Sequence, residues 1–194
     1  EHGSPVEVDA LPAPDCSSCD SFSDVDEDAY YAVPVAWALR RSVTNGTSPT
    51  TFSPELPCTR EQIVTFLWRA AGSPAPKSKE SAFTDVAAGS YYETAVQWAV
   101  ENGITSGTSA TTFSPNATCT RAQTVTFLWR SQKSPADGTA NSFTDVADGT
   151  YYTDAVKWAV KNGITSGTSA TTFSPNADCS RAQLVKFLYS CLGK

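Results

Sequence analysis

Three arginines occupy positions at which a protein can bind an anion. Arg60, Arg121 and Arg181 each follow a Thr or Ser that is predicted to begin a helix. The N-H groups of a helix N-terminus and the positive end of its dipole favour negative charge, and a guanidinium adds a planar set of donors. This combination suits a carboxylate or phosphate on a ligand. In the alternative interpretation each arginine pairs internally with an acid. The candidate acids are Asp24, Asp85 and Asp145.

Side chains for catalysis are scarce. The only histidine is His2, so a Ser-His-Asp or Cys-His arrangement elsewhere in the chain is excluded. Paired carboxylates can hydrolyse glycosides without histidine, but most acids beyond the N-terminal segment lie at helix starts and on predicted surfaces. The sequence therefore favours a protein that is not an enzyme and that uses no cofactor.

Two short segments have partial metal-site patterns. Cys16 and Cys19 have zinc-knuckle spacing, but a second close pair and nearby histidine ligands are absent. Residues 24–28 place carboxylates at alternate positions, as a calcium loop does. However, Ala29 stands where that loop needs glycine and Val35 where it needs an acid. We interpret residues 24–28 as a solvated acidic turn and predict no metal site.

The chain has six cysteines, which suit a secreted protein with some disulfides. Three recur at equivalent positions and three lie outside them, so the set comprises Cys58, Cys119 and Cys179, then Cys16, Cys19 and Cys191. A helix between Cys179 and Cys191 would separate them by about 18 Å, which excludes that pair. We favour disulfides that join the N-terminal cysteines to a neighbouring repeat.

One unit is repeated three times along the chain. The motif Phe22-Ser-Asp-Val25 recurs at residues 83–86 and 143–146, and a tyrosine pair, a tryptophan, Thr-Phe-Ser-Pro, a cysteine and an arginine follow it at nearly constant spacing. The second and third repeats are identical at 36 of 48 positions from Phe83 to Arg130. We assign residues 1–20 to an acidic arm, 21–72, 82–131 and 142–194 to the repeats, and 73–81 and 132–141 to linkers.

Each repeat is predicted to fold as helix, loop, helix. In the second repeat, residues 91–101 place Tyr92 and Val96 near one helical face, and Asn102-Gly103 supplies a left-handed end. Phe113 is expected to be tucked beneath the loop that follows. The second helix begins with a capping-box pattern. Its three copies are Thr120-Arg-Ala-Gln123, Thr59-Arg-Glu-Gln62 and Ser180-Arg-Ala-Gln183.

Two amphipathic helices in about 50 residues cannot bury both apolar faces alone. We therefore predict one mainly α domain with pseudo-threefold packing around a shared core. Tryptophans on the helical faces are expected in this core, whereas the first tyrosine of each pair is expected to be partly exposed. The tryptophans are Trp37, Trp98 and Trp158, and the tyrosines are Tyr30, Tyr91 and Tyr151.

The net charge of −6 is concentrated at the N-terminus. Nine of the 20 acids lie in the first 28 residues, which contain no Lys or Arg, whereas residues 29–194 carry 14 basic and 11 acidic residues. This distribution argues against a dedicated nucleic-acid binder. No run approaches the roughly 18 apolar residues of a membrane helix, so membrane insertion is not predicted. A start at Glu1 suggests a processed protein or an excised fragment.

The ordered motifs resemble three tandem S-layer homology domains. Phe-x-Asp-Val, Asn-Gly-Ile-Thr, Thr-Phe-Ser-Pro-Asn and Thr-Arg-Ala-Gln carry the resemblance over about residues 21–192. It implies a mainly α, pseudo-threefold spindle. In that fold each repeat gives one helix to a central bundle, and another helix with its preceding loop to one of three prongs.

The resemblance also implies a function, namely noncatalytic anchoring of a secreted protein at the bacterial cell surface. The partner would be secondary cell-wall polysaccharide, typically with pyruvylated sugars held in grooves between prongs. The arginines would meet the ligand acid, and the aspartates of the adjoining repeat would orient sugar hydroxyls. The full set of candidate ligand-binding residues is Arg60, Arg121, Arg181, Asp24, Asp85, Asp145, Tyr30, Tyr91 and Tyr151.

A second hypothesis is a structural module for self-assembly or protein contact, with other surface-layer subunits as partners. In that case the repeats form a rigid knob and the arginines are paired internally.

Overall fold

The computed structural model describes residues 22–78 and 80–193. This part of the chain contains six α-helices and no β-strands. The helices are α1 (Ala32–Arg40), α2 (Arg60–Ala70), α3 (Glu93–Glu101), α4 (Arg121–Ser131), α5 (Thr153–Lys161) and α6 (Arg181–Leu192). The predicted mainly α class is confirmed, and each repeat contributes two helices joined by a long loop.

The second helix of each repeat begins where its capping motif predicts. At α4 the Thr120 hydroxyl accepts the N-H of Gln123 at 3.2 Å, and the Gln123 side chain accepts the N-H of Thr120 at 3.0 Å. The same two bonds begin α6. At α2 the Gln62 side chain accepts the N-H of Thr59 at 3.1 Å, while the Thr59 hydroxyl has no hydrogen-bond partner in the described region.

The first helix of the second repeat is shorter than predicted. It begins at Glu93 rather than at residue 91, with Tyr92 as its N-cap residue. Tyr91 and Tyr92 instead form a turn in which their rings meet edge to face at 5.2 Å. The predicted helix end is confirmed, because Gly103 has a φ of +67°.

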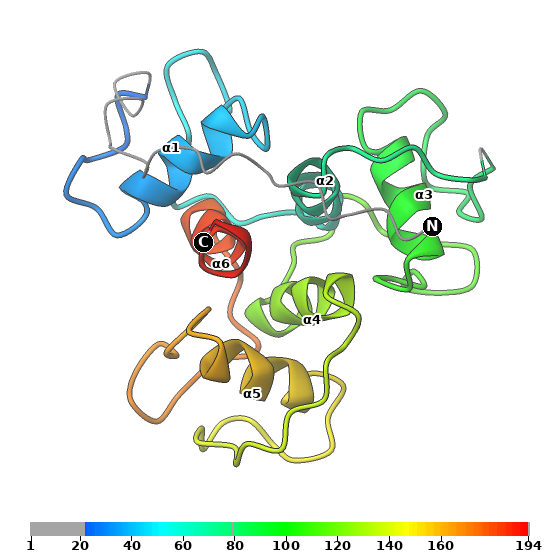
Figure 1. The fold of residues 1–194 in the computed structure, drawn as a ribbon. Helices are drawn as coiled ribbons and strands as arrows, with labels where there is room; N and C mark the ends of the chain where they lie inside the picture. Colours follow the sequence, from blue (N-terminus) through cyan, green and yellow to red (C-terminus); the bar gives the residue numbers. More distant parts are fainter. Residues whose placement is uncertain (1–21, 79, 194) are drawn as a thin grey trace, which may run out of the picture.

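The outer helix of each repeat packs on the second helix of the preceding repeat. Thus α3 packs on α2, α5 packs on α4, and α1 closes the circle by packing on α6. The helices α2, α4 and α6 contact one another and lie in the middle of the molecule, with α1, α3 and α5 outside them (Figure 1). Because the first repeat completes the third, the repeats depend on one another for burial of their apolar faces.

One hydrophobic core runs through all three repeats. The tryptophans of the outer helices are 7–9% exposed and belong to this core, as predicted. Below each loop lies a fully buried phenylalanine that packs against the phenylalanine of the Phe-x-Asp-Val motif, with ring centroids 5.8–5.9 Å apart. The buried loop residues are Phe52, Phe113 and Phe173. The expectation that Phe113 lies beneath its loop is confirmed.

Three cysteines meet where the second helices begin. The N-H of Cys58 donates to the carbonyl of Cys179 at 2.8 Å, that of Cys119 to Cys58 at 2.8 Å, and that of Cys179 to Cys119 at 2.9 Å. These bonds close a ring that ties the three repeats together, and we call its members the ring cysteines. All three are fully buried.

The predicted disulfides are wrong for the described cysteines. Among the described residues, the ring cysteines and Cys191 form no disulfide. Cys16 and Cys19 lie outside the described residues. Burial raises the pKa of the ring thiols, to about 12 for Cys119 and about 11 for Cys179. Because the thiolate is the species that forms disulfides, the ring cysteines behave as small apolar core residues.

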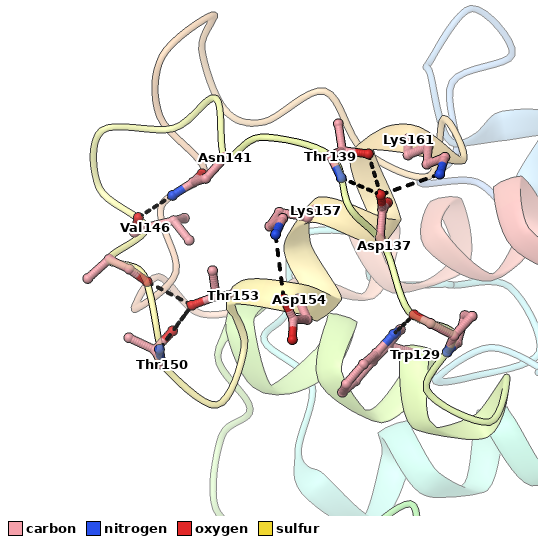
Figure 2. A network of polar contacts seen from close by, with 12 residues as sticks. Trp129, Asp137, Thr139, Asn141, Val146, Thr150, Thr153, Asp154, Lys157 and Lys161 are labelled. Carbon is pink, nitrogen blue, oxygen red and sulfur yellow. Dashed lines mark hydrogen bonds and ion pairs between the residues drawn. The ribbon is translucent and has the colours of Figure 1, made fainter.

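The linkers are tied to the helices beside them. In the second linker, the carbonyl of Pro135 accepts the indole N-H of Trp129 at 3.0 Å, and the carboxylate of Asp137 accepts a hydrogen bond from Lys161 at 3.4 Å (Figure 2). At position 101, equivalent to 161, a glutamate is present instead. It accepts the N-H groups of the first linker, from Lys77 at 2.9 Å and Ser78 at 2.6 Å.

None of the helices in the described ranges has the length and apolar character needed to cross a membrane. Within the same ranges, no group of three or more His, Cys, Asp or Glu side chains could hold a metal ion.

In the acidic turn at residues 24–28, Asp24 accepts hydrogen bonds from backbone amides of its own repeat, and Asp26 accepts the N-H of Asp28 at 2.9 Å.

Candidate functional site: grooves between the repeats

The three predicted arginines join consecutive repeats. Each guanidinium donates from Nε to the carbonyl of a buried loop phenylalanine in the next repeat, at 2.8–2.9 Å. The pairs are Arg60 with Phe113, Arg121 with Phe173, and Arg181 with Phe52. The third bond closes the circle, as the helix packing does. All three side chains are only 3–5% exposed.

The first amides of each second helix are not free for a ligand. The N-H of Arg60 donates to the carbonyl of Ala117 at 2.9 Å, and the N-H of Glu61 donates to that of Pro115 at 3.1 Å. The other two repeats make the same bonds at their own helix starts. These amides, which the sequence predicts to be free for an anion, are instead satisfied by the loop of the next repeat. The guanidinium therefore remains as the group that can meet an anion.

Each guanidinium lies over two phenylalanine rings. The Cζ atom of Arg121 lies 4.7 Å from the ring centroid of Phe173 and 5.5 Å from that of Phe187, and the other two arginines are placed alike. Burial lowers the pKa of all three arginines, but an arginine remains protonated in proteins. The Nη atoms of Arg60 and Arg121 make no hydrogen bond to any residue that the structure describes, so they are free to donate to a ligand.

The predicted aspartates fix the loop peptide that each arginine binds. Asp85 accepts the N-H of Phe113 and the N-H of Ser114, both at 2.8 Å. Ser114 has a φ of +58°, which is unusual for a residue with a side chain. Asp24 and Asp145 make the same pair of bonds in their repeats. Among the described residues no ion pair joins these aspartates to the arginines, because their oxygens are engaged by amides.

The pKa of the Asp85 carboxyl is lowered. Partial burial alone would raise it, but the hydrogen bonds from Phe113 and Ser114 outweigh that cost, and the Arg60 charge adds to the lowering. The carboxylate, which holds the loop in place, is therefore favoured over the neutral acid.

Two grooves contain cavities lined by all three repeats. Groove A, of about 660 Å³, combines Arg121 of the second repeat, Tyr30 of the first, and Gln183, Lys186 and the loop at residues 163–168 of the third. Among the residues that the structure describes, no acid lines groove A.

Groove B, of about 290 Å³, repeats this arrangement one repeat earlier. It combines Arg60 with Tyr151, Gln123, Arg130 and the loop at residues 105–108. The described residues that line groove B also include no acid.

The third junction, groove C, has the equivalent residues but different partners. Its arginine is Arg181 and its tyrosine is Tyr91, whose hydroxyl donates to the carboxylate of Glu61 at 2.9 Å. An Nη atom of Arg181 contacts the hydroxyl of Thr44 at 3.5 Å. The pKa of Tyr91 is raised, first by burial and then by Glu61.

The structure brings the predicted arginines and tyrosines together across repeats. The tyrosines are 55–59% exposed, which confirms the predicted exposure. The aspartates are not among the lining residues of groove A or groove B and instead bond the loop peptide that each arginine binds. Sequence reasoning missed Lys186 and the capping glutamines. Lys186 could have been found by comparing the repeats, because the other two have Thr65 and Thr126 at its position.

The repeats match a known family in the regions that form these grooves. The S-layer homology domain matches residues 21–64, 82–125 and 142–185, which is more than half of the chain. The chain belongs to the S-layer homology domain family. This membership confirms the resemblance seen in the ordered motifs and supports a role as a cell-wall anchoring module.

Three relatives share parts of this S-layer homology chain. The surface-layer 125 kDa protein of Lysinibacillus sphaericus is 37% identical over 98 residues, 50% of this chain and 8% of that protein. The cell surface protein of Thermoanaerobacter kivui is 34% identical over 113 residues, 56% of this chain and 15% of that protein. An endoglucanase of Bacillus sp. (strain KSM-635) is 30% identical over 179 residues, 89% of this chain and 19% of that protein. The chain thus spans less than a fifth of the length of each relative. Its family and its surface-layer and cell-surface relatives indicate that it is a cell-surface protein.

Proposed function

We propose that this chain is a noncatalytic module that anchors a surface protein by binding acidic secondary cell-wall polysaccharide in the grooves between its repeats. The acid recognised is a pyruvylated sugar. The arginines bind its carboxylate and the exposed tyrosines contact the sugar face. In this proposal α2, α4 and α6 are the central bundle of a pseudo-threefold spindle, and α1, α3 and α5 belong to its prongs.

One observation carries the proposal. In grooves A and B a buried arginine, whose Nη atoms bond no described residue, lies beside an exposed tyrosine from another repeat, and none of the described lining residues is an acid. A guanidinium at such a place can bind a carboxylate through two parallel hydrogen bonds. Hydroxyls of the loop in groove A, such as those of Thr165 and Ser166, can bind sugar hydroxyls.

The match to an endoglucanase concerns only 19% of that protein, so it does not carry catalysis to this chain. The grooves also have the wrong chemistry for glycoside hydrolysis, which uses a pair of carboxyl groups on either side of the scissile bond. Grooves A and B present arginine and lysine side chains instead. We therefore propose binding without turnover.

A sedimentation assay with purified bacterial cell wall tests the proposal. The variant changes Arg60, Arg121 and Arg181 to Gln, because Gln keeps a side-chain N-H while removing the positive charge. We expect wild-type protein to sediment with the wall, and the triple variant to stay in solution with an unchanged circular dichroism spectrum. Wall from which pyruvate has been removed by mild acid should also fail to bind wild-type protein.

Three results would count against the proposal. If the folded triple variant still binds the wall, the arginines do not recognise the ligand. If neither protein binds the wall but both self-associate in analytical ultracentrifugation, the module serves assembly instead. Release of soluble sugar from the wall by wild-type protein would contradict the absence of turnover.

A further inference from the structure

We propose that the three grooves are unequal, with groove A as the main site for the acidic sugar, Lys186 as its second cation, and groove C closed by Glu61. This inference rests on the proposed function and concerns which copies of the repeated site carry it. It is drawn from the few positions at which the repeats differ.

Groove A has the largest set of unengaged polar groups. Lys186 is half-buried and forms no ion pair with any described acid, and its Nζ lies 6.0 Å from the centroid of the Tyr189 ring. The hydroxyl of Tyr30 has no hydrogen-bond partner among the described residues. Together with the Nη atoms of Arg121, these groups offer two positive charges and a phenol to one cavity.

Groove B has its second cation in a different place. Position 126, which is equivalent to Lys186, is threonine. In groove B the positive charge comes from Arg130, one helical turn later, at the position that Ser190 occupies in the third repeat. Arg130 already donates to the carbonyl of Ile104 at 3.2 Å. The cavity volume falls from about 660 to about 290 Å³. Groove B is therefore a smaller site whose second cation is partly engaged.

In groove C an acid is hydrogen-bonded to the tyrosine, whereas in groove A the charge of Glu55 acts on Tyr30 without a hydrogen bond. Position 61 is glutamate, whereas the equivalent positions 122 and 182 are alanine. The Glu61 carboxylate accepts the hydroxyl of Tyr91, so the phenol that is free in groove A is occupied here. A carboxylate at this place repels an acidic ligand. Because Arg181 also contacts Thr44, groove C has the fewest groups left for a sugar.

The chain itself supplies substitutions that test this ranking with little risk to folding. The change Lys186→Thr introduces the residue that the other repeats have at that position, and Glu61→Ala does the same for groove C. Lys157→Gln and Asp148→Ala are the matched controls. Each removes the same charge outside the cavities and introduces the residue of the second repeat.

The experiment is isothermal titration calorimetry of the full chain with the methyl glycoside of a pyruvylated N-acetylhexosamine. We expect wild type to show one tight site. Lys186→Thr should weaken it about tenfold, as expected for loss of one hydrogen bond to a charged group, while Lys157→Gln leaves it unchanged. Glu61→Ala should add a further binding site, while Asp148→Ala does not.

The outcomes separate this inference from the proposed function. If Lys186→Thr binds the probe as tightly as wild type does, the ranking of the grooves is overturned but the proposed function is not. The same holds if wild type already fills three equal sites or if Glu61→Ala adds none. If wild type shows no binding to this probe or to pyruvylated wall, both proposals are refuted.

Discussion

Replacing Asp85 by asparagine tests how the loops and grooves are held. The carboxylate accepts two backbone N-H groups at 2.8 Å each, from Phe113 and Ser114. Asparagine can accept only one of them, and its NH₂ group then faces the other. A hydrogen bond to a charged group contributes about 1.5–3 kcal/mol, and partial exposure favours the lower end of that range. We therefore expect a loss of about 2 kcal/mol in the free energy of unfolding.

The substitution should also disturb groove B, because the carbonyl of Phe113 accepts a hydrogen bond from the Arg60 side chain. For a chain of this size, 2 kcal/mol lowers the Tm by about 4–8 °C. Thermal and urea unfolding followed by circular dichroism measure the loss. Asp148→Asn is the control, since Asp148 is exposed and the second repeat has Ala88 at that position. A loss below about 0.5 kcal/mol, or an equal loss in the control, would refute this account of the loop.

The pH dependence has a defined sign. The pKa of Asp85 is lower in the folded chain than its unfolded value of about 3.9, so its stabilisation is complete above about pH 4 and disappears as the pH falls through the folded pKa. The stability difference between wild type and Asp85→Asn should therefore shrink between pH 5 and pH 2. A difference that stays constant over this range would contradict the assignment.

Two further predictions concern the fold. Gly107→Ala should lower the free energy of unfolding, measured in urea, by at least about 2 kcal/mol more than Gly103→Ala does. A Cβ at position 107 would lie 2.5 Å from the Phe83 ring, whereas a Cβ at position 103 meets nothing within 4 Å. Equal losses would show that the loop shifts to accept a side chain. The ring cysteines should resist iodoacetamide in the native protein and react in guanidinium, as mass spectrometry of labelled peptides can measure. Rapid labelling of the ring cysteines in folded protein would contradict their burial.

Local features of the fold could be predicted because their causes are local. A capping motif needs only neighbouring residues, so the starts of α2, α4 and α6 follow from Thr59, Thr120 and Ser180. Burial of the repeated tryptophans and exposure of the repeated tyrosines also follow from helical periodicity and position. The predicted start of α3 is wrong by two residues, because Tyr91 and Tyr92 form a turn with an edge-to-face contact before the helix begins.

The partners of the site residues could not be predicted from the sequence. Arg60 binds a carbonyl 53 residues away, and Arg181 binds one 129 residues away in the first repeat. Nearly identical repeats have nearly identical local signals, so the sequence does not distinguish the loop of the same repeat from that of the next. The predicted disulfides failed for a related reason, because the ring hydrogen bonds place the thiols inside the core.

The sequence by itself determined the helical class, the threefold repetition, the family and the residue types that form each groove. Only the tertiary structure decided that grooves A and B each draw on three repeats, that the helix amides are already occupied, and that Glu61 bonds the tyrosine of groove C while Lys186 lines groove A. The physical reason is the closed circle of packing. Contacts that join the first repeat to the third form only when the whole chain has folded, and no local propensity encodes them.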